Sequence, residues 1–107
     1  MNESEFNSLA DGMLAALEQA MDACGADLDY ELKAGGVLEI VCANGSKVIV
    51  NRHTAAREIW VAARSGGFHF APSAGRWLSA RDGSELLETL SRCLSEQCGE
   101  PVALVIP

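Results

Sequence analysis

Apolar side chains recur every three or four positions in the first part of the chain. They are Phe6, Leu9, Met13, Leu17, Ala20 and Cys24. This spacing predicts an amphipathic helix over 3–23, because residues three and four apart share one helix face. Asn2 and Glu5 form a capping-box pattern at its start, and Gly25 is a typical stop.

The segments that follow are typical of strands. The first alternates apolar and polar residues with the period of two that half-buried strands show, and the next two are apolar runs. The segments cover 27–32, 37–42, 47–51, 58–64, 68–70 and 76–78. Asn44 and Gly45 predict a tight hairpin between the second and third strands, with positive φ at both residues. Short connections throughout predict an antiparallel meander of strands that are adjacent in sequence.

A second helix is predicted near the end of the chain, after a capping turn at 82–85. Its apolar stripe consists of Leu86, Leu87, Leu90 and Leu94. The alternation of Val102, Leu104 and Ile106 then predicts an extended tail against the body of the protein. Together these elements predict one domain over 1–107 of the α+β class. It is a two-layer sandwich in which both helices cover one face of a five- to six-stranded antiparallel sheet.

The 107 residues carry 15 acidic and 8 basic side chains, for a net charge of −7. Such a chain repels phosphate backbones, so nucleic acid is not an expected partner. The charge is uneven, because residues 1–39 hold nine acids and one base whereas residues 40–81 have a net charge of +5. Negative charge is therefore concentrated on the first helix and first strand, which indicates a surface for cations or basic partners.

The apolar runs, the start of the sequence and the spacing of its cysteines indicate the compartment and the state of the thiols. No apolar run reaches the roughly 18 residues of a membrane helix, and the acidic start is unlike a signal peptide. We therefore expect a cytoplasmic protein with no membrane contact, whose four cysteines are reduced thiols. Cys42 and Cys93 are interpreted as small buried hydrophobic residues, and no Cys or His spacing fits a zinc site.

Six carboxylates are predicted to share one acidic ridge, because a short connection joins the first helix to the first strand. They are Asp11, Glu18 and Asp22 on one side of the helix and Asp27, Asp29 and Glu31 on one face of the strand. Open oxygen ligands suit hard or intermediate cations such as Fe²⁺, Fe³⁺, Mn²⁺ or Ca²⁺, with dissociation constants on the order of 10⁻⁵–10⁻³ M. The alternative is a solvated acidic face that binds no metal.

Trp60 is the candidate contact for a protein partner. Alternation over 58–64 places it on the solvent face of the sheet, where Trp is a frequent binding anchor. The alternative is a place in the core, since Trp is highly buried on average. His69 is expected to point outward from the neighbouring strand, and no nucleophile motif accompanies it, so no catalytic centre is predicted.

These motifs resemble the frataxin family, specifically its bacterial branch. The matching residues run from Asn44 to Arg52, then Ile59 and Trp60, then Gly66 to Phe70, then Trp77, Asp82 and Gly83. The resemblance implies an α/β sandwich and a non-enzymatic, iron-binding protein of iron–sulfur cluster assembly. It also implies that iron (Fe²⁺ or Fe³⁺) is weakly bound at the ridge positions. These are Glu18, Asp22, Asp27, Asp29 and Glu31, with Asp11 at the margin.

The same resemblance implies two protein partners. The acidic ridge would dock on a basic patch of a cysteine desulfurase, acting as a regulator, an iron carrier or both. Trp60, Asn51 and His69 would contact the iron–sulfur scaffold protein. A monomer is expected, with iron-driven oligomerisation left open. The alternative functions are an iron-storage or ferroxidase-like protein and a metal-independent acidic interaction module.

Overall fold

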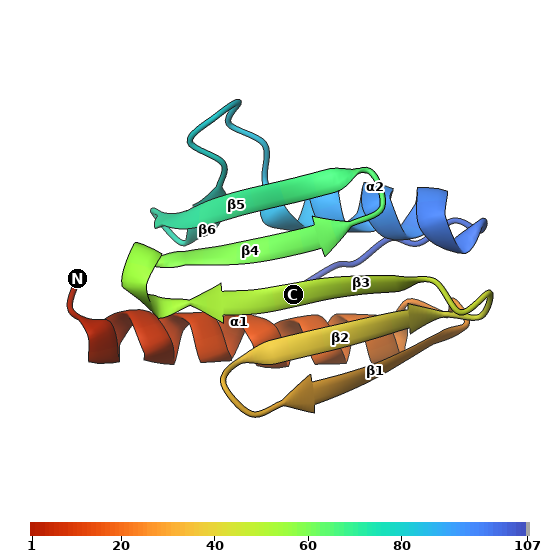
Figure 1. The fold of residues 1–107 in the computed structure, drawn as a ribbon, viewed down its shortest axis with the longest axis horizontal. Coiled ribbons are helices and arrows are strands. Elements are labelled where there is room, and N and C mark those ends of the chain that lie inside the picture. Colours follow the sequence, from red (N-terminus) through yellow and green to blue (C-terminus); the bar gives the residue numbers. More distant parts are fainter. Residues whose placement is uncertain (107) are drawn as a thin grey trace.

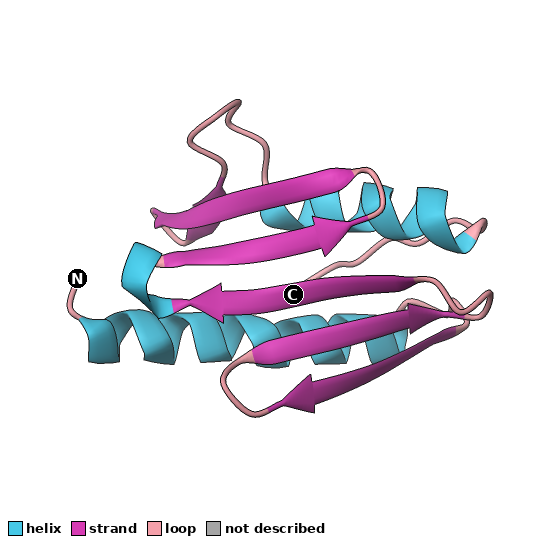
Figure 2. Ribbon diagram, viewed as in Figure 1, coloured by secondary structure: helices cyan, strands magenta, loops and turns pink. Residues whose placement is uncertain are grey.

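An antiparallel sheet of six strands, arranged in sequence order, runs through the molecule (Figures 1 and 2). The computed structural model describes residues 1–106, so Pro107 lies outside the description. The elements are α1 (Glu3–Ala23), β1 (Leu28–Lys33), β2 (Val37–Cys42), β3 (Lys47–His53), the 3-10 turn η1 (Thr54–Ala56), β4 (Glu58–Ala63), β5 (Gly66–Ser73), β6 (Arg76–Leu78) and α2 (Leu86–Cys98). Within the described residues, neither helix is long and apolar enough to cross a membrane.

The predicted capping box begins α1. The Asn2 side chain accepts from the Glu5 N–H at 2.8 Å, and the Glu5 carboxylate accepts from the Asn2 N–H at 3.1 Å. The buried stripe is Phe6, Ala10, Leu14, Leu17, Ala20 and Met21. Leu9, predicted for this stripe, is 43% exposed. The apolar surface of α1 is wider than its contact with the sheet, and Leu9 lies at the margin.

One face of the sheet carries the core. Each central strand turns two solvent-excluded side chains toward the helices, namely Leu38 and Ile40 from β2, Val48 and Val50 from β3, and Ile59 and Val61 from β4. These side chains form one cluster with the buried residues of α1 and α2. The predicted sandwich, with both helices on one face of the sheet, is therefore confirmed.

The turn of the β2–β3 hairpin differs from the prediction. Gly45 has a φ of 84°, but Asn44 does not have positive φ. The Gly45 N–H donates to the Cys42 carbonyl at 2.9 Å, which closes a turn followed by a left-handed glycine. The Asn44 side chain accepts from the Ser46 N–H at 2.9 Å and donates to the Gln97 carbonyl at 2.9 Å. It therefore holds the hairpin against the end of α2 instead of forming the predicted two-residue turn.

Two serines of α2 fix the C-terminal tail. The Ser95 hydroxyl accepts from the Val102 N–H at 2.9 Å, and the Ser91 hydroxyl accepts from the Leu104 N–H at 3.0 Å. Both of these tail side chains are buried. The predicted packing of an extended tail against the body is thus confirmed as far as residue 106, with serine hydroxyls replacing a partner strand.

Cys42 and Cys98 form a disulfide, so the prediction of four reduced thiols is wrong. The two residues are separated by 56 positions in the sequence, and their Cα atoms are 5.1 Å apart. The hydrogen bonds between the β2–β3 hairpin and the end of α2 bring them together. Cys93 is a buried free cysteine, as predicted, and Cys24 is free and half-buried.

Loss of this disulfide should lower the stability of the protein. A cross-link across a separation of 56 residues restricts the unfolded chain and stabilises by about 2–4 kcal/mol. We expect Cys42→Ser combined with Cys98→Ser to lower the free energy of unfolding by that amount in urea titrations. A reducing agent should have the same effect on the unaltered protein. Cys24→Ser is the control and should retain the sensitivity to reductant, whereas equal midpoints for reduced and oxidised protein contradict the disulfide.

Candidate metal-binding and partner-binding surfaces

Five of the six predicted carboxylates lie on the last turns of α1, on the outer strand β1 and on the connection between them, at one edge of the molecule (Figure 1). The acidic ridge is defined here as Glu18, Asp22, Asp27, Asp29 and Glu31. Glu18 is half-buried and the other four are exposed. Because β1 pairs only with β2, the acidic ridge borders solvent along the free side of this strand.

The register of β1 shows that the acidic ridge has two flanks. Tyr30 pairs with buried Ile40, so the even-numbered residues of β1 face the helices. Asp29 and Glu31 therefore point to the open face of the sheet, by the alternation of side chains along a strand. Glu18 and Asp22 stand on the helix side. The two acidic rows were predicted to form one surface, and they lie on opposite sides of the edge strand β1.

Tyr30 joins the strand to the helix. Its hydroxyl donates to Asp22 Oδ1 at 2.7 Å. This hydrogen bond is the main reason why the pKa of Tyr30 lies above its ordinary value, and the negative charges of Asp22 and Glu18 raise it further. Tyr30, Asp22 and Glu18 are therefore close enough to influence one another on the helix side of the acidic ridge, although the two carboxylates carry like charge.

Like charges also meet on the open-face flank. Glu31 pairs across the strands with Glu39 of β2. Lys33 Nζ lies 2.9 Å and Lys47 Nζ 3.4 Å from the Glu39 carboxylate. The hydrogen bond from Lys33 lowers the pKa of Glu39 and raises the pKa of Lys33. The charge of Glu39 is balanced in this way, whereas Glu31 makes no ion pair with any residue in the range 1–106.

Asp11, the marginal member in the prediction, is set apart from the acidic ridge. Its carboxylate pairs with Arg52 Nη1 of β3 at 2.6 Å. Gly36 leaves room for Arg52, since a Cβ at that glycine would lie 2.9 Å from the Arg52 Cβ. The pair ties α1 to the sheet, and a cation already balances the charge of Asp11.

No three His, Cys, Asp or Glu side chains of residues 1–106 are grouped so that they could hold a metal ion. The members of the acidic ridge form an open row of oxygen atoms. Carboxylates in such a row could bind a hard cation singly or in pairs, leaving water on the remaining positions. The predicted assignment of these five residues to a metal stays a prediction.

On the open face of the sheet, Trp60 lies between two histidines. Its ring is 3.7 Å from the His53 ring and 4.2 Å from the His69 ring, centroid to centroid, with interplanar angles of 12° and 8°. Trp60 pairs with Asn51 in β3 and with His69 in β5. The three residues predicted for partner binding are therefore adjacent, and the solvent-face placement of Trp60 is confirmed.

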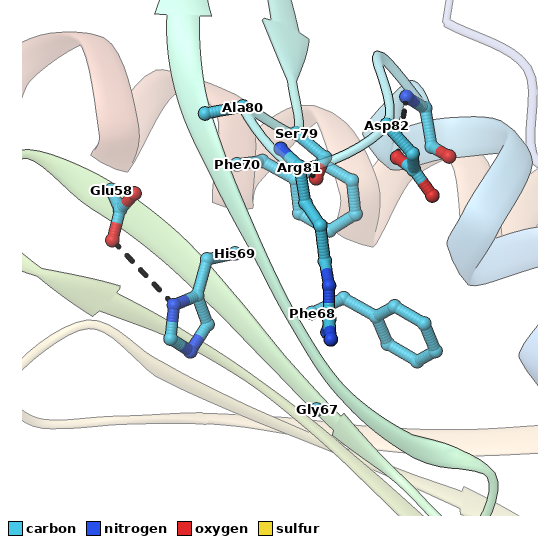
Figure 3. Close-up of a pocket in the computed structure, with 10 residues that line it drawn as sticks. Glu58, Gly67, Phe68, His69, Phe70, Ser79, Ala80, Arg81 and Asp82 are labelled. Atoms are coloured by element: carbon cyan, nitrogen blue, oxygen red, sulfur yellow. Dashed lines mark hydrogen bonds and ion pairs between the residues drawn. The ribbon is translucent and has the colours of Figure 1, made fainter.

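Glu58 completes this open-face cluster. Its Oε1 accepts from Trp60 Nε1 at 2.9 Å. The same atom lies 3.8 Å from His69 Nδ1 (Figure 3). The sequence analysis missed both Glu58 and His53 as members. Alternation over 58–64 already placed Glu58 on the face of Trp60. His53 could be found only through the β3–β4 pairing, which sets it opposite Glu58. The cluster presents a flat aromatic surface, and the indole N–H of Trp60 already has a hydrogen-bond acceptor within the sheet.

The chain is similar in sequence to known proteins over nearly its whole length. A family described as a frataxin-like domain matches residues 1–100. A protein of Dechloromonas aromatica described as "Iron-sulfur cluster assembly protein CyaY" is 56% identical over 104 residues, covering 97% of this chain and 99% of the relative. A protein of Tolumonas auensis with the same description is 44% identical, with the same coverage.

Solved structures agree with the sequence matches. Frataxin from Psychromonas ingrahamii superposes with a TM-score of 0.89 at 34% identity, covering 98% of this chain and 99% of that one. Trimeric frataxin from Saccharomyces cerevisiae, described as complexed with ferrous iron, superposes with a TM-score of 0.66 at 26% identity. That match covers 90% of this chain and 87% of the yeast chain.

The contact between Tyr30 and Asp22 can be tested by titration, because Tyr30 is the only tyrosine in the sequence. We expect Asp22→Ala to move the phenolate absorbance titration to lower pH, since both the hydrogen bond and a negative charge are removed. Asp29→Ala is the control on the opposite flank and should move it less. The stabilisation from a raised pKa is present below pH 10 and is lost as pH rises through the folded-state value. Superimposable titrations for the unaltered and Asp22→Ala proteins contradict the contact.

Proposed function

The chain belongs to the frataxin family, and on that premise we propose that it is an iron-binding protein of iron–sulfur cluster assembly. Its bacterial relatives carry the description of cluster assembly proteins. We propose a non-enzymatic role for a single domain over 1–107, in which the protein carries iron to a cysteine desulfurase, regulates that enzyme, or does both.

The exposed acidic ridge is the observation that carries this proposal. Its carboxylates lie on and beside the edge strand β1, which no second strand of residues 1–106 covers on its free side, and residues 1–39 have nine acids against one base. Like charges held this closely raise the free energy of the folded state unless cations or a basic surface approach them. An acidic ridge of this kind therefore favours both a bound cation and a basic partner.

Iron suits the chemistry of these ligands. Fe²⁺ and Fe³⁺ accept carboxylate oxygens, and an open row leaves positions for water, so the ion is held weakly and can be passed on. Iron is here a cargo of the protein. The yeast relative is described as trimeric and complexed with ferrous iron, which supports testing iron binding and assembly state together.

Two surfaces support two partners. The acidic ridge is suited to a basic patch on the desulfurase, because long-range attraction depends on summed charge. The open-face cluster is suited to the scaffold protein through Asn51, Trp60 and His69, since a Trp on a flat surface is a common binding anchor. The acidic ridge and this cluster are at different places on the sheet, so both partners could bind one molecule.

An iron-storage or ferroxidase-like function is less well supported. Di-iron ferroxidase sites use Glu and His side chains that project into a helix-bundle core. The carboxylates of the acidic ridge lie on the surface of an α/β sandwich, and four of the five are exposed. A metal-independent interaction module remains the alternative that the following experiment separates.

Reversing charge on the open-face flank tests the acidic ridge without disturbing Tyr30. We expect Asp29→Lys combined with Glu31→Lys to weaken binding to the desulfurase about tenfold or more, which is about 1.4 kcal/mol. Calorimetry should show weaker Fe²⁺ binding in the same variant. The matched control is Glu88→Lys combined with Glu96→Lys, which changes the net charge equally on α2.

The outcomes separate the alternatives. Weaker desulfurase binding with unchanged iron affinity favours the metal-independent module. Equal losses in the acidic-ridge variant and the α2 control would show that only net charge matters, and unaltered binding in both variants would refute the proposal. Raised salt should weaken the desulfurase complex of the unaltered protein, since exposed charges are screened.

The open-face cluster gives a second prediction. We expect Trp60→Ala to weaken binding to the scaffold protein about tenfold to thirtyfold, as loss of a hot-spot Trp costs about 2 kcal/mol. Iron binding at the acidic ridge should stay unchanged. Ala62→Ser, on the same face of β4, is the control. Scaffold affinity that survives Trp60→Ala would assign that partner to another surface.

A further inference from the structure

Half of strand β5 has a free edge. The short strand β6 pairs only with Ala71, Pro72 and Ser73 of β5. Residues Gly66–Phe70 pair with β4 on one side, and no strand of the described residues 1–106 pairs with them on the other. Unpaired edges are sites where a further strand can add, and proteins usually protect them with lysine, proline or a covering segment.

The β5–β6 turn shows which backbone groups point outward. Ala74 and Gly75 both have positive φ, at 49° and 81°, so they form a two-residue hairpin turn. In such a hairpin the flanking pair, Ser73 and Arg76, exchanges hydrogen bonds. Alternation along β5 then directs the N–H and C=O groups of Gly67 and His69 away from β4. Two residues on the free edge therefore offer backbone donors and acceptors to a partner.

A groove of about 420 Å³ runs beside this edge. One wall is β5 from Gly67 to Phe70, and the other is the connection between β6 and α2 (Figure 3). The Ser79 N–H donates to the Ser84 carbonyl at 2.8 Å, and the Gly83 N–H donates to the Ser79 carbonyl at 2.9 Å. These bonds shape the second wall, so the groove is formed before any ligand arrives.

Arg81 supplies the groove with a positive charge. Its side chain extends from the connection toward Phe68 (Figure 3), and it forms no ion pair with any residue in the described range. Arg92 lies 5.7 Å from the Phe68 ring centroid. Asp82 and Glu58 also line the groove. Asp82 accepts from the Ser84 N–H at 2.9 Å, and its pKa is lowered first by the hydrogen bonds from Ser84 and to a lesser extent by the charge of Arg81. Glu58 accepts from Trp60 Nε1.

We propose that the free half of β5 is a docking edge for an extended, acidic peptide segment of a partner protein. The segment adds to the sheet in line with β6, and its backbone pairs with Gly67 and His69. A carboxylate of the segment pairs with the Arg81 guanidinium, which presents several donors in one plane. A Cβ built at Gly67 would meet nothing within 4 Å, so the sheet face beside this edge is open.

This docking edge is independent of the acidic ridge. It is at the opposite end of the strand order, near β6, whereas the acidic ridge is on α1 and β1. The two sites also share no side chain, because the groove is lined by residues of β4, β5 and the connection between β6 and α2. A basic protein surface and an acidic segment could therefore bind one molecule at the same time, without competing for a side chain.

Amide exchange and peptide binding test the proposal. The probe is a seven-residue peptide of alternating Thr and Val with a central Glu. In the free protein we expect fast exchange at the Gly67 and His69 amides and slow exchange at Phe68 and Phe70. Peptide should slow the first pair and shift their resonances in a saturable way. Arg81→Gln should weaken binding about tenfold, and a peptide with central Gln should lose affinity to the same extent.

The control variant is Arg76→Gln, which removes an exposed arginine from the same hairpin and should change the affinity less than twofold. An absence of shifts at Gly67 and His69 up to millimolar peptide would overturn the proposal. Binding that is equally strong in Arg81→Gln would overturn the role of the carboxylate. Shifts at the same two amides that grow with protein concentration alone would show a second copy of the chain as the occupant, which also overturns it.

Discussion

Packing of both helices against one face of the sheet leaves every odd-numbered residue of β3 on the other face. The pairing register of β3, β4 and β5 then places Asn51 beside Trp60 and Trp60 beside His69. The burial of aliphatic side chains that drives this packing is the largest favourable contribution to folding. The open-face cluster is therefore placed by the core, although none of its members belongs to the core.

The acidic ridge also depends on the packing of α1 against the sheet, and the repulsion between its charges opposes that packing. Helix and strand bring carboxylates together, and repulsion between them opposes folding. The structure offsets part of this cost with neighbouring groups, through the Tyr30 hydroxyl on one flank and Lys33 and Lys47 around Glu39 on the other. Glu31 and Asp29 keep their charge available. The repulsion that remains between these carboxylates opposes folding, and a bound cation or basic surface would offset it.

Features with a local cause could be predicted from the sequence. The capping box and the three-four spacing placed α1 at its observed bounds, and alternation placed Trp60 on the open face. Features that depend on distant packing could not. The Cys42–Cys98 bond needs the position of α2 over the hairpin, the Asn44 turn depends on a carbonyl of α2, and the His53 stack needs the register of three strands.

Each strand of the meander pairs with its neighbour in sequence, and this order bears on how the molecule folds. Contacts between segments close in sequence cost little loop entropy, and chains rich in them fold quickly. The α1–β1 edge and the β3–β4–β5 face are both contiguous stretches of the chain. Both surfaces therefore depend mainly on contacts between segments that are close in sequence, whereas the Cys42–Cys98 bond joins residues 56 positions apart.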